Sequence, residues 1–276
     1  MNVDGKVIII TGAARGIGQE YARYFGGLGA RIVIADINDC SQTLDLVKAE
    51  KGSAVAAKLD VASAASAMET AQRAVDAFGR IDALINNAAL YGALKGGRFD
   101  AISEADWDAA MAVNVKGIWN CCKAAVPAIR RAGGGSIVNI ASLAATYGMP
   151  YGLHYTTSKA AVIGLTRGLA RELGRDNIRV NAVAPSAVLT EGTREFFADK
   201  ADKALDTIKA NQAIARNLVS SDLVGVVHWL VSDASALVTG PNDRGRWRHG
   251  HAVNGCGARA CFLSRARTAR PADHPT

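Results

Sequence analysis

The chain has 276 residues, a formal net charge of +7 and a pI of about 9.3, and a length of this order favours one domain. A basic balance of this size is typical of proteins that bind nucleic acid. Seven Arg and only two Asp follow Gly240, however, which leaves a net charge of +2 on residues 1–240 and excludes the body as an electrostatic nucleic-acid binder.

No apolar run reaches membrane-spanning length, and the sequence starts with a strand pattern instead of a charged and apolar signal segment. The five cysteines show no metal-like spacing, and a reducing compartment is their simplest interpretation. We therefore expect a cytoplasmic protein with no metal, no membrane contact and no nucleic-acid partner.

The first elements are a strand, a glycine-rich turn and a helix. Residues 6–10 are a short apolar run, residues 11–18 read Thr-Gly-Ala-Ala-Arg-Gly-Ile-Gly, and helical patterning continues to about Leu28. This order is typical of the start of a dinucleotide fold, where missing side chains let a pyrophosphate approach backbone N–H groups at the helix N-terminus. The spacing differs from G-x-G-x-x-G, so a glycine turn without a ligand remains an alternative.

The second strand, residues 31–35, ends at Asp36, where a carboxylate can bind a ribose 2′-hydroxyl. This position favours NAD, because a 2′-phosphate would meet a like charge. Arg15 in the glycine loop instead favours NADP, since an arginine near the ribose can pair with a 2′-phosphate. The sequence predicts NAD, with Asp36 outweighing Arg15.

Further strand-like runs occur at about residues 54–59, 82–86, 136–141 and 178–184, and segments with helical patterning separate them. This alternation is the signature of βαβ units. We expect one α/β domain over residues 1–240, a doubly wound parallel sheet of Rossmann type with helices on both faces.

The candidate residues for proton transfer at a carbonyl are Ser142, Tyr155 and Lys159. Tyr155 and Lys159 are four residues apart, so a helix places them on one face. A nearby ammonium favours the phenolate, and we expect Lys159 to lower the pKa of Tyr155. Ser142 can hydrogen-bond a substrate oxygen within reach of the phenol. Taken alone, the Tyr-x-x-x-Lys spacing equally describes a solvated helix face.

Together these motifs resemble the short-chain dehydrogenase/reductase family, in its compact type, from about Lys6 to Gly240. The resemblance implies four catalytic positions and a tetrameric or dimeric assembly. The implied catalytic residues are Asn114, Ser142, Tyr155 and Lys159, of which Asn114 holds a water that links Lys159 to solvent. The implied cofactor-binding residues are Gly12, Arg15, Gly16, Ile17, Gly18, Asp36, Asp60, Val61, Asn87, Ala88, Tyr155, Lys159, Pro185, Val188 and Thr190.

Two positions depart from the family pattern. Ala89 carries a methyl group where the family usually has none, and Ser186 replaces a glycine that adopts positive φ freely. Either change can reshape the nicotinamide pocket without removing a reacting group.

Two further features have alternative interpretations. The stretch from Leu189 to Ala215 corresponds to the family's mobile loop over the substrate, and Phe196 and Phe197 within it either cover the substrate or pack a short helix. His154 adjoins Tyr155, but a lone histidine is more often structural than catalytic.

Residues 241–276 differ from the body in composition, and we expect them to be a disordered arginine-rich tail. The family continues after residue 240 with an edge strand of the type Gln-Thr-Ile-Ala-Val-Asp-Gly-Gly. Synonymous codons for residues 241–254 exist that, after loss of their first nucleotide, encode this strand, then Met-Val-Met-Arg and a stop. We hypothesise a frameshifted read-through that removes or alters the last strand. A natural extension and a nucleic-acid arm are the alternatives.

The sequence thus predicts an NAD(H)-dependent oxidoreductase that interconverts a secondary alcohol and a ketone, with Tyr155 as general acid and base. A 3-oxoacyl thioester reductase of the same family is one alternative. A dinucleotide-binding regulatory module without turnover is another.

Overall fold

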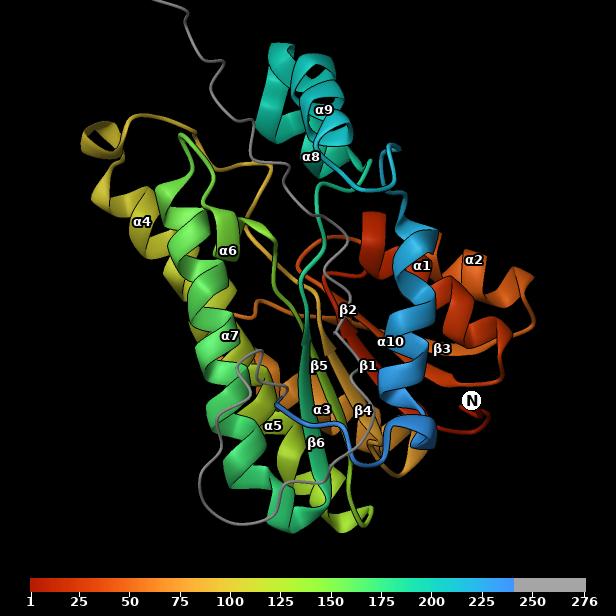
Figure 1. Ribbon diagram of the computed structural model, residues 1–276. Coiled ribbons are helices and arrows are strands. Elements are labelled where there is room, and N and C mark those ends of the chain that lie inside the picture. Colours follow the sequence, from red (N-terminus) through yellow and green to blue (C-terminus); the bar gives the residue numbers. More distant parts are fainter. Residues whose placement is uncertain (241–276) are drawn as a thin grey trace, which may run out of the picture.

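The computed structural model describes residues 1–240, which form one α/β unit around a parallel sheet (Figure 1). The six strands follow the order β3-β2-β1-β4-β5-β6. Their bounds are Val7–Thr11 (β1), Arg31–Asp36 (β2), Ser53–Lys58 (β3), Ala83–Asn86 (β4), Gly135–Ile140 (β5) and Ile178–Val183 (β6). All predicted strands of the body are confirmed to within two residues. The predicted tail and the edge strand that it replaces lie outside the described residues.

Helices connect the strands and cover both faces of the sheet. They are α1 Gly16–Gly27, α2 Ser41–Ala49, α3 Ala64–Phe78, α4 Glu104–Met111, α5 Gly117–Arg131, α6 Ala144–Tyr147, α7 Leu153–Leu173, α8 Glu191–Phe197, α9 Ala201–Ala210 and α10 Val224–Val231. Within residues 1–240, no helix combines the length and apolar character that crossing a membrane requires.

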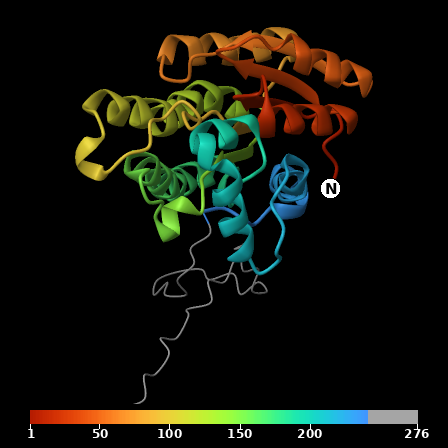
Figure 2. The same cartoon turned by 90° about the horizontal axis from the view of Figure 1, so that it is seen from above.

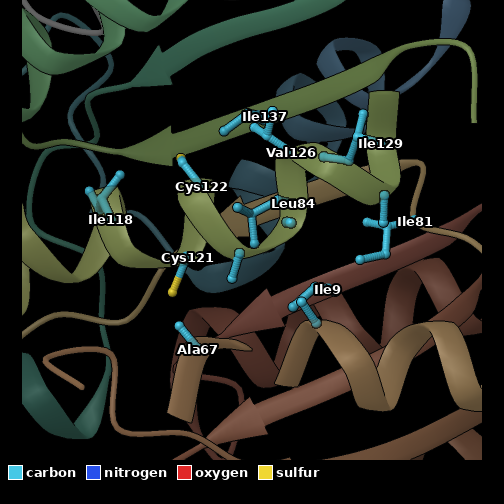
Figure 3. Packing of buried hydrophobic residues seen from close by; sticks show 14 of the residues in the cluster. Ile9, Ala67, Ile81, Leu84, Ile118, Cys121, Cys122, Val126, Ile129 and Ile137 are labelled. Carbon is cyan, nitrogen blue, oxygen red and sulfur yellow. The ribbon is translucent and has the colours of Figure 1, made fainter. Parts of the chain in front are cut away.

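Side-chain alternation along the strands divides the interior into two cores. In β1, Ile8 and Ile10 join the core beneath α1 and α10, whereas Ile9 points to the opposite core beneath α3 and α5. All three side chains are at most 2% exposed. Because both faces are covered, β1 reads as an unbroken apolar run, as expected for the centre of a parallel sheet. Figure 3 shows Ile9 near Leu84 and Ala67 in the second core.

The helical stretch before β5 is divided. The sequence pattern is helical from Trp107 to about residue 132, whereas helix α4 starts at Glu104, where the Ser103 side chain accepts a hydrogen bond from the Asp106 backbone N–H. A π-helical segment, Ala112–Lys116, separates α4 from α5. Such π-bulges are frequent at functional sites, and Asn114 lies inside this one.

The carboxyl ends of the parallel strands meet at one edge of the sheet, where ligands bind in open α/β folds. Helices α8 and α9 lie beyond this edge, at the top of Figure 1. Seen from above in Figure 2, they cross between α7 and α10. The predicted loop over the substrate, residues 189–215, therefore contains two helices positioned over the strand ends.

Candidate active site

The glycine turn connects the end of β1 to the start of α1. Gly12 and Gly16 have φ values of +65° and +62°, which L-residues with side chains rarely adopt. A Cβ at Gly12 would lie 2.6 Å from the Ala88 Cα, whereas a Cβ at Gly16 would meet only Thr190, at 3.7 Å. Gly12 thus permits close packing of two strand ends, and Gly16 faces open space where the first turn of α1 presents its backbone N–H groups.

Asn87 joins the end of β4 to this turn. Its Nδ2 donates to the carbonyl oxygens of Thr11 and Gly12, at 3.0 and 2.9 Å. The backbone N–H groups of Asn87 and Ala88 both donate to the Thr11 Oγ1. A Cβ at Gly18 would lie 2.6 Å from the Asn87 Nδ2, so this glycine makes room for the amide. The two strand ends are held in one fixed arrangement.

Asp36 lies at the end of β2 and is 8% exposed. Its Oδ2 accepts from the Ala14 backbone N–H at 2.9 Å, and its Oδ1 accepts from the backbone and side chain of Asn38. Oδ1 thus uses both of its lone pairs, whereas Oδ2 keeps one that no described group occupies. The carboxylate is thus fixed beside the glycine turn and retains acceptor capacity for a ribose hydroxyl.

Arg15 is engaged by helix α8. Its guanidinium binds both carboxylate oxygens of Glu195, at 2.6 and 2.9 Å, and Glu191 at 3.4 Å. These carboxylates raise the pKa of Arg15, with the Glu195 hydrogen bond as the main cause. The expected alternative partner of Arg15, a 2′-phosphate, would have to compete with this bidentate ion pair.

Asp60 and Val61 follow β3 on the same edge of the sheet. The exposed Asp60 accepts from the Ala62 backbone N–H at 2.9 Å, and Val61 is buried. The Val61 carbonyl accepts a hydrogen bond from the Asn120 Nδ2 at 2.9 Å. The Val61 side chain packs against Gly117, where a Cβ would lie 2.7 Å from the Val61 Cγ2. Their predicted adenine contact stays a prediction.

Tyr155 and Lys159 lie one turn apart on α7 and face β5. Tyr155 is 9% exposed and Lys159 is 2% exposed, and the Lys159 Nζ lies 5.8 Å from the centre of the Tyr155 ring. The Nζ donates to the Ile140 carbonyl at 2.7 Å, while the Tyr155 hydroxyl hydrogen-bonds the Ser142 side chain. The end of β5 and the first turns of α7 thereby bring the three predicted residues together.

The pKa of Tyr155 differs in direction from its prediction. Burial raises it above the ordinary value of 10.0, the charge of Tyr91 adds to this rise, and the hydrogen bond from Ser142 opposes it. Burial also lowers the pKa of Lys159 to about 8. Removing the phenolate from water is the largest cause of the rise in the Tyr155 pKa, and the Lys159 ammonium does not offset it. Tyr155 is therefore a protonated phenol at neutral pH.

Asn114 is fully buried in the π-helical segment and does not touch Lys159. Its Oδ1 accepts from the Leu90 backbone N–H at 2.7 Å. Its Nδ2 donates to the Leu90 carbonyl at 3.2 Å and to the Ser158 Oγ at 3.0 Å. These bonds connect the loop after β4 to α7 between Tyr155 and Lys159, so Asn114 fixes the orientation of the catalytic helix.

A cavity of about 930 Å³ opens beside these side chains. Its wall contains predicted residues from both halves of the sheet: Ile17, Asn87, Ser142, Tyr155, Lys159, Pro185, Val188 and Thr190. Ala89 and Ser186, the two departures, also line it. Ser186 does not adopt a positive φ, so the missing glycine causes no backbone strain there.

Aromatic rings connect the cavity to α8. The Tyr91 ring lies 4.8 Å from the Tyr155 ring and stacks on Phe196 at 4.7 Å with an interplanar angle of 14°. Phe197 instead lines the cavity. Each interpretation thus holds for one residue. Phe196 packs against a neighbouring ring, and Phe197 faces the cavity, where it can cover a substrate.

Sequence reasoning missed Tyr91 and weighed His154 as structural. Tyr91 follows a strand end at the ligand-binding edge, and that position alone could have indicated it. His154 is fully buried, neither ring nitrogen has a hydrogen-bond partner within the described region, and it does not line the cavity. It has no contact that would support a catalytic role.

The residues present fit a nicotinamide dinucleotide. Gly16 leaves the helix N-terminus open, Asp36 is held at the adjacent strand end, and the cavity continues from Ile17 to Tyr155. One end of the cavity thus offers phosphate-binding backbone, and the other offers a proton donor. Among residues 1–240, no group of three His, Cys, Asp or Glu side chains is arranged to hold a metal ion.

Comparison with known proteins agrees with this arrangement. The family model described as enoyl-(acyl carrier protein) reductase matches residues 12–242. Among curated relatives, the 3-oxoacyl-[acyl-carrier-protein] reductase FabG of Thermotoga maritima is 37% identical, over 87% of this chain and 96% of the relative. D-threitol dehydrogenase of Mycolicibacterium smegmatis is 35% identical, over 86% of this chain and 90% of the relative.

A solved structure gives the same result. Carveol dehydrogenase from Mycobacterium avium in complex with NAD superposes with a TM-score of 0.81 at 32% identity, covering 87% of this chain and 95% of the other. The match of both sequence and fold extends across the described residues, and the chain therefore belongs to the short-chain dehydrogenase/reductase family of oxidoreductases.

Proposed function

We propose that this protein is an NAD(H)-dependent oxidoreductase that interconverts a secondary alcohol and a ketone. The observation that carries the proposal is the convergence of Ser142, Tyr155 and Lys159 on one cavity wall, in a space that Ile17 in the first turn of α1 also lines. When bound, a nicotinamide dinucleotide supplies the hydride donor or acceptor.

The side chains divide the remaining chemistry among them. Ser142 donates a hydrogen bond that holds the substrate oxygen, and the neutral Tyr155 phenol gives its proton to that oxygen during reduction. In the reverse direction the phenolate takes the alcohol proton, and the Lys159 ammonium stabilises it. Lys159 also binds the cofactor ribose. Asn114 orients α7 and supports the proton relay through water.

Two observations support NAD over NADP. The Asp36 carboxylate is fixed beside the glycine turn, where a 2′-phosphate would bring a like charge. Arg15, which could offset that charge, is bound by Glu195 and Glu191. The carveol dehydrogenase structure is described with NAD, and this neighbour supports the same assignment.

Reduction of a 3-oxoacyl thioester is the second candidate. The 37% identity to a 3-oxoacyl-[acyl-carrier-protein] reductase favours it. A regulatory module without turnover is disfavoured, because all four catalytic positions carry the residues that the chemistry requires.

A panel of secondary alcohols, assayed with NAD and with NADP by absorbance of the reduced nicotinamide, tests the proposal. We expect activity with NAD that falls at least about a hundredfold in Tyr155→Phe, because general acid–base catalysis contributes on this order. Unchanged activity in Tyr155→Phe would refute the assigned chemistry.

The proposal extends to the assembly and the compartment. A homo-tetramer or dimer is expected from the family if the C-terminal strand is intact, and a small-molecule alcohol or ketone would be the only partner besides the cofactor. Cys40, Cys121 and Cys122 are buried and free, which suits a reducing cytoplasm.

A further inference from the structure

The charges on the cavity wall all have the same sign. The lining residues within the described part of the chain include Lys159, Lys200 and Lys203, and they include no Asp or Glu. Lys159 belongs to the catalytic group. The other two lysines come from the segment over the strand ends and have no part in the reaction proposed above.

Lys203 lies on the face of α9 that is turned toward the cavity, and Lys200 immediately precedes this helix. The lining residues of this segment follow the i, i+3, i+4, i+7, i+8 pattern of one helical face: Lys200, Lys203, Ala204, Thr207, Ile208 and Asn211. The acidic residues of the same segment, Asp199, Asp202 and Asp206, lie off this face and do not line the cavity.

Neither ammonium is neutralised by a neighbour. Asp202 pairs with Arg194 at 3.7 Å, and no ion pair or hydrogen bond joins Lys200 or Lys203 to another described side chain. Both residues are exposed, so a ligand that enters the cavity mouth can reach them. A pair of unpaired ammonium groups at a cavity mouth attracts anions and raises their local concentration.

Apart from the lysines and the catalytic residues, the cavity wall is largely apolar. It contains Leu143, Tyr147, Met149, Pro150 and Phe197. A ligand that fills this space therefore has an apolar body between its carbonyl group and its charged end.

We propose that the substrate is an anionic ketone or alcohol, with its carbonyl or hydroxyl oxygen at Tyr155 and a carboxylate or phosphate bound by Lys200 and Lys203. This inference rests on the proposed function, since it specifies the substrate of the same site. The two lysines act on binding and do not touch the reacting atoms.

Two pairs of matched ketones test the proposal and separate the two anion sources. 5-Oxo-5-phenylpentanoate and its methyl ester differ by one carboxylate charge. Acetoacetyl-4′-phosphopantetheine and acetoacetyl-pantetheine share the reacting group and differ by one phosphate. KM is measured for each in the wild type, in Lys200→Gln/Lys203→Gln, and in Lys209→Gln, an exposed lysine of α9 that does not line the cavity.

We expect the double variant to raise KM for one anionic ketone about tenfold, because each partly exposed ion pair contributes about two- to fivefold. KM for its neutral counterpart should change less than about twofold by the same reasoning, since no ion pair is lost. Restoring charge in Lys200→Arg/Lys203→Arg should recover most of the loss, and kcat should stay near the wild-type value. Added salt should weaken binding of the anionic ketone and leave binding of the neutral ketone unchanged.

A rise in KM confined to the carboxylate member of the first pair identifies a carboxylic acid substrate. A rise in KM confined to the phosphate-bearing thioester identifies a phosphate-bearing substrate. Equal effects on charged and neutral ketones, or no effect on either, would overturn the inference. Calorimetric binding of the same four compounds with saturating cofactor gives this comparison without turnover. Tyr155→Phe tests the chemistry separately, so the charge inference can fail while the proposed reaction stands.

Discussion

Replacing Lys159 by methionine should make the folded protein more stable at neutral pH while removing its catalytic ammonium. Lys159 is 2% exposed, and burial lowers its pKa from 10.5 to about 8. At about 1.4 kcal/mol per pH unit, this lowering corresponds to about 3 kcal/mol of unfavourable free energy for the charged form in the folded state. Methionine has a similar length and removes this cost.

The gain is smaller than the full electrostatic cost. The Ile140 carbonyl loses the hydrogen bond that it accepts from Lys159 at 2.7 Å, which costs about 1 kcal/mol. A net stabilisation of about 2 kcal/mol remains. For a domain of this size, it raises the melting temperature by about 4–8 °C.

The pH dependence has a definite sign. The folded-state pKa of Lys159 is depressed, so the cost is fully present below pH 8 and disappears as the pH rises toward 10.5. Thermal melts without dinucleotide should show the advantage of Lys159→Met at pH 7 and its decline by pH 10. Lys209→Met, at an exposed position of α9, is the control and should melt like the wild type. A Lys159→Met variant that melts lower than the wild type at pH 7 would refute the assigned desolvation cost.

Three other perturbations follow from the structure. Asp36→Ala should raise KM for NAD about 10- to 100-fold and lower KM for NADP, because hydrogen bonds to a charged acceptor are lost along with the like charge; initial rates with both cofactors check this. Glu195→Gln should free Arg15 and lower KM for NADP about two- to fivefold, and an unchanged KM for NADP would count against the ion pair. A chain re-coded after Gly240 to end in the expected edge strand should melt higher and sediment as a larger oligomer, whereas equal melting temperature and mass would refute the prediction that residues 241–276 weaken the fold and its assembly.

The sheet could be predicted from the sequence because its strands are buried on both faces. Residues 7–10 and 32–35 are apolar throughout, and each run ends where a glycine turn or an acidic residue begins. The local pattern is sufficient to predict these strands and their ligand-binding edge, since strand ends in a parallel sheet share one edge. Ser142 follows such a strand end, whereas Tyr155 and Lys159 could be proposed from their four-residue spacing on a helix.

Other features depend on contacts between distant segments. The ion pair between Arg15 and Glu195 spans 180 residues, and the π-helical turn at Asn114 is set by its bonds to Leu90 and Ser158. The direction of the Tyr155 pKa depends on how deeply the ring is buried, which spacing alone does not give. Sequence patterns identify the groups, and packing decides their partners and charge.

Transfer of deuterium from NADH that carries deuterium at both C4 positions tests the central claim most directly. In a single turnover with a prochiral ketone, mass spectrometry should find deuterium on the carbinol carbon of the wild-type product. Tyr155→Phe should still bind the reduced cofactor, which calorimetry can verify, yet form the alcohol at least about a hundredfold more slowly. An alcohol without deuterium at that carbon, or an undiminished rate in Tyr155→Phe, would contradict the account.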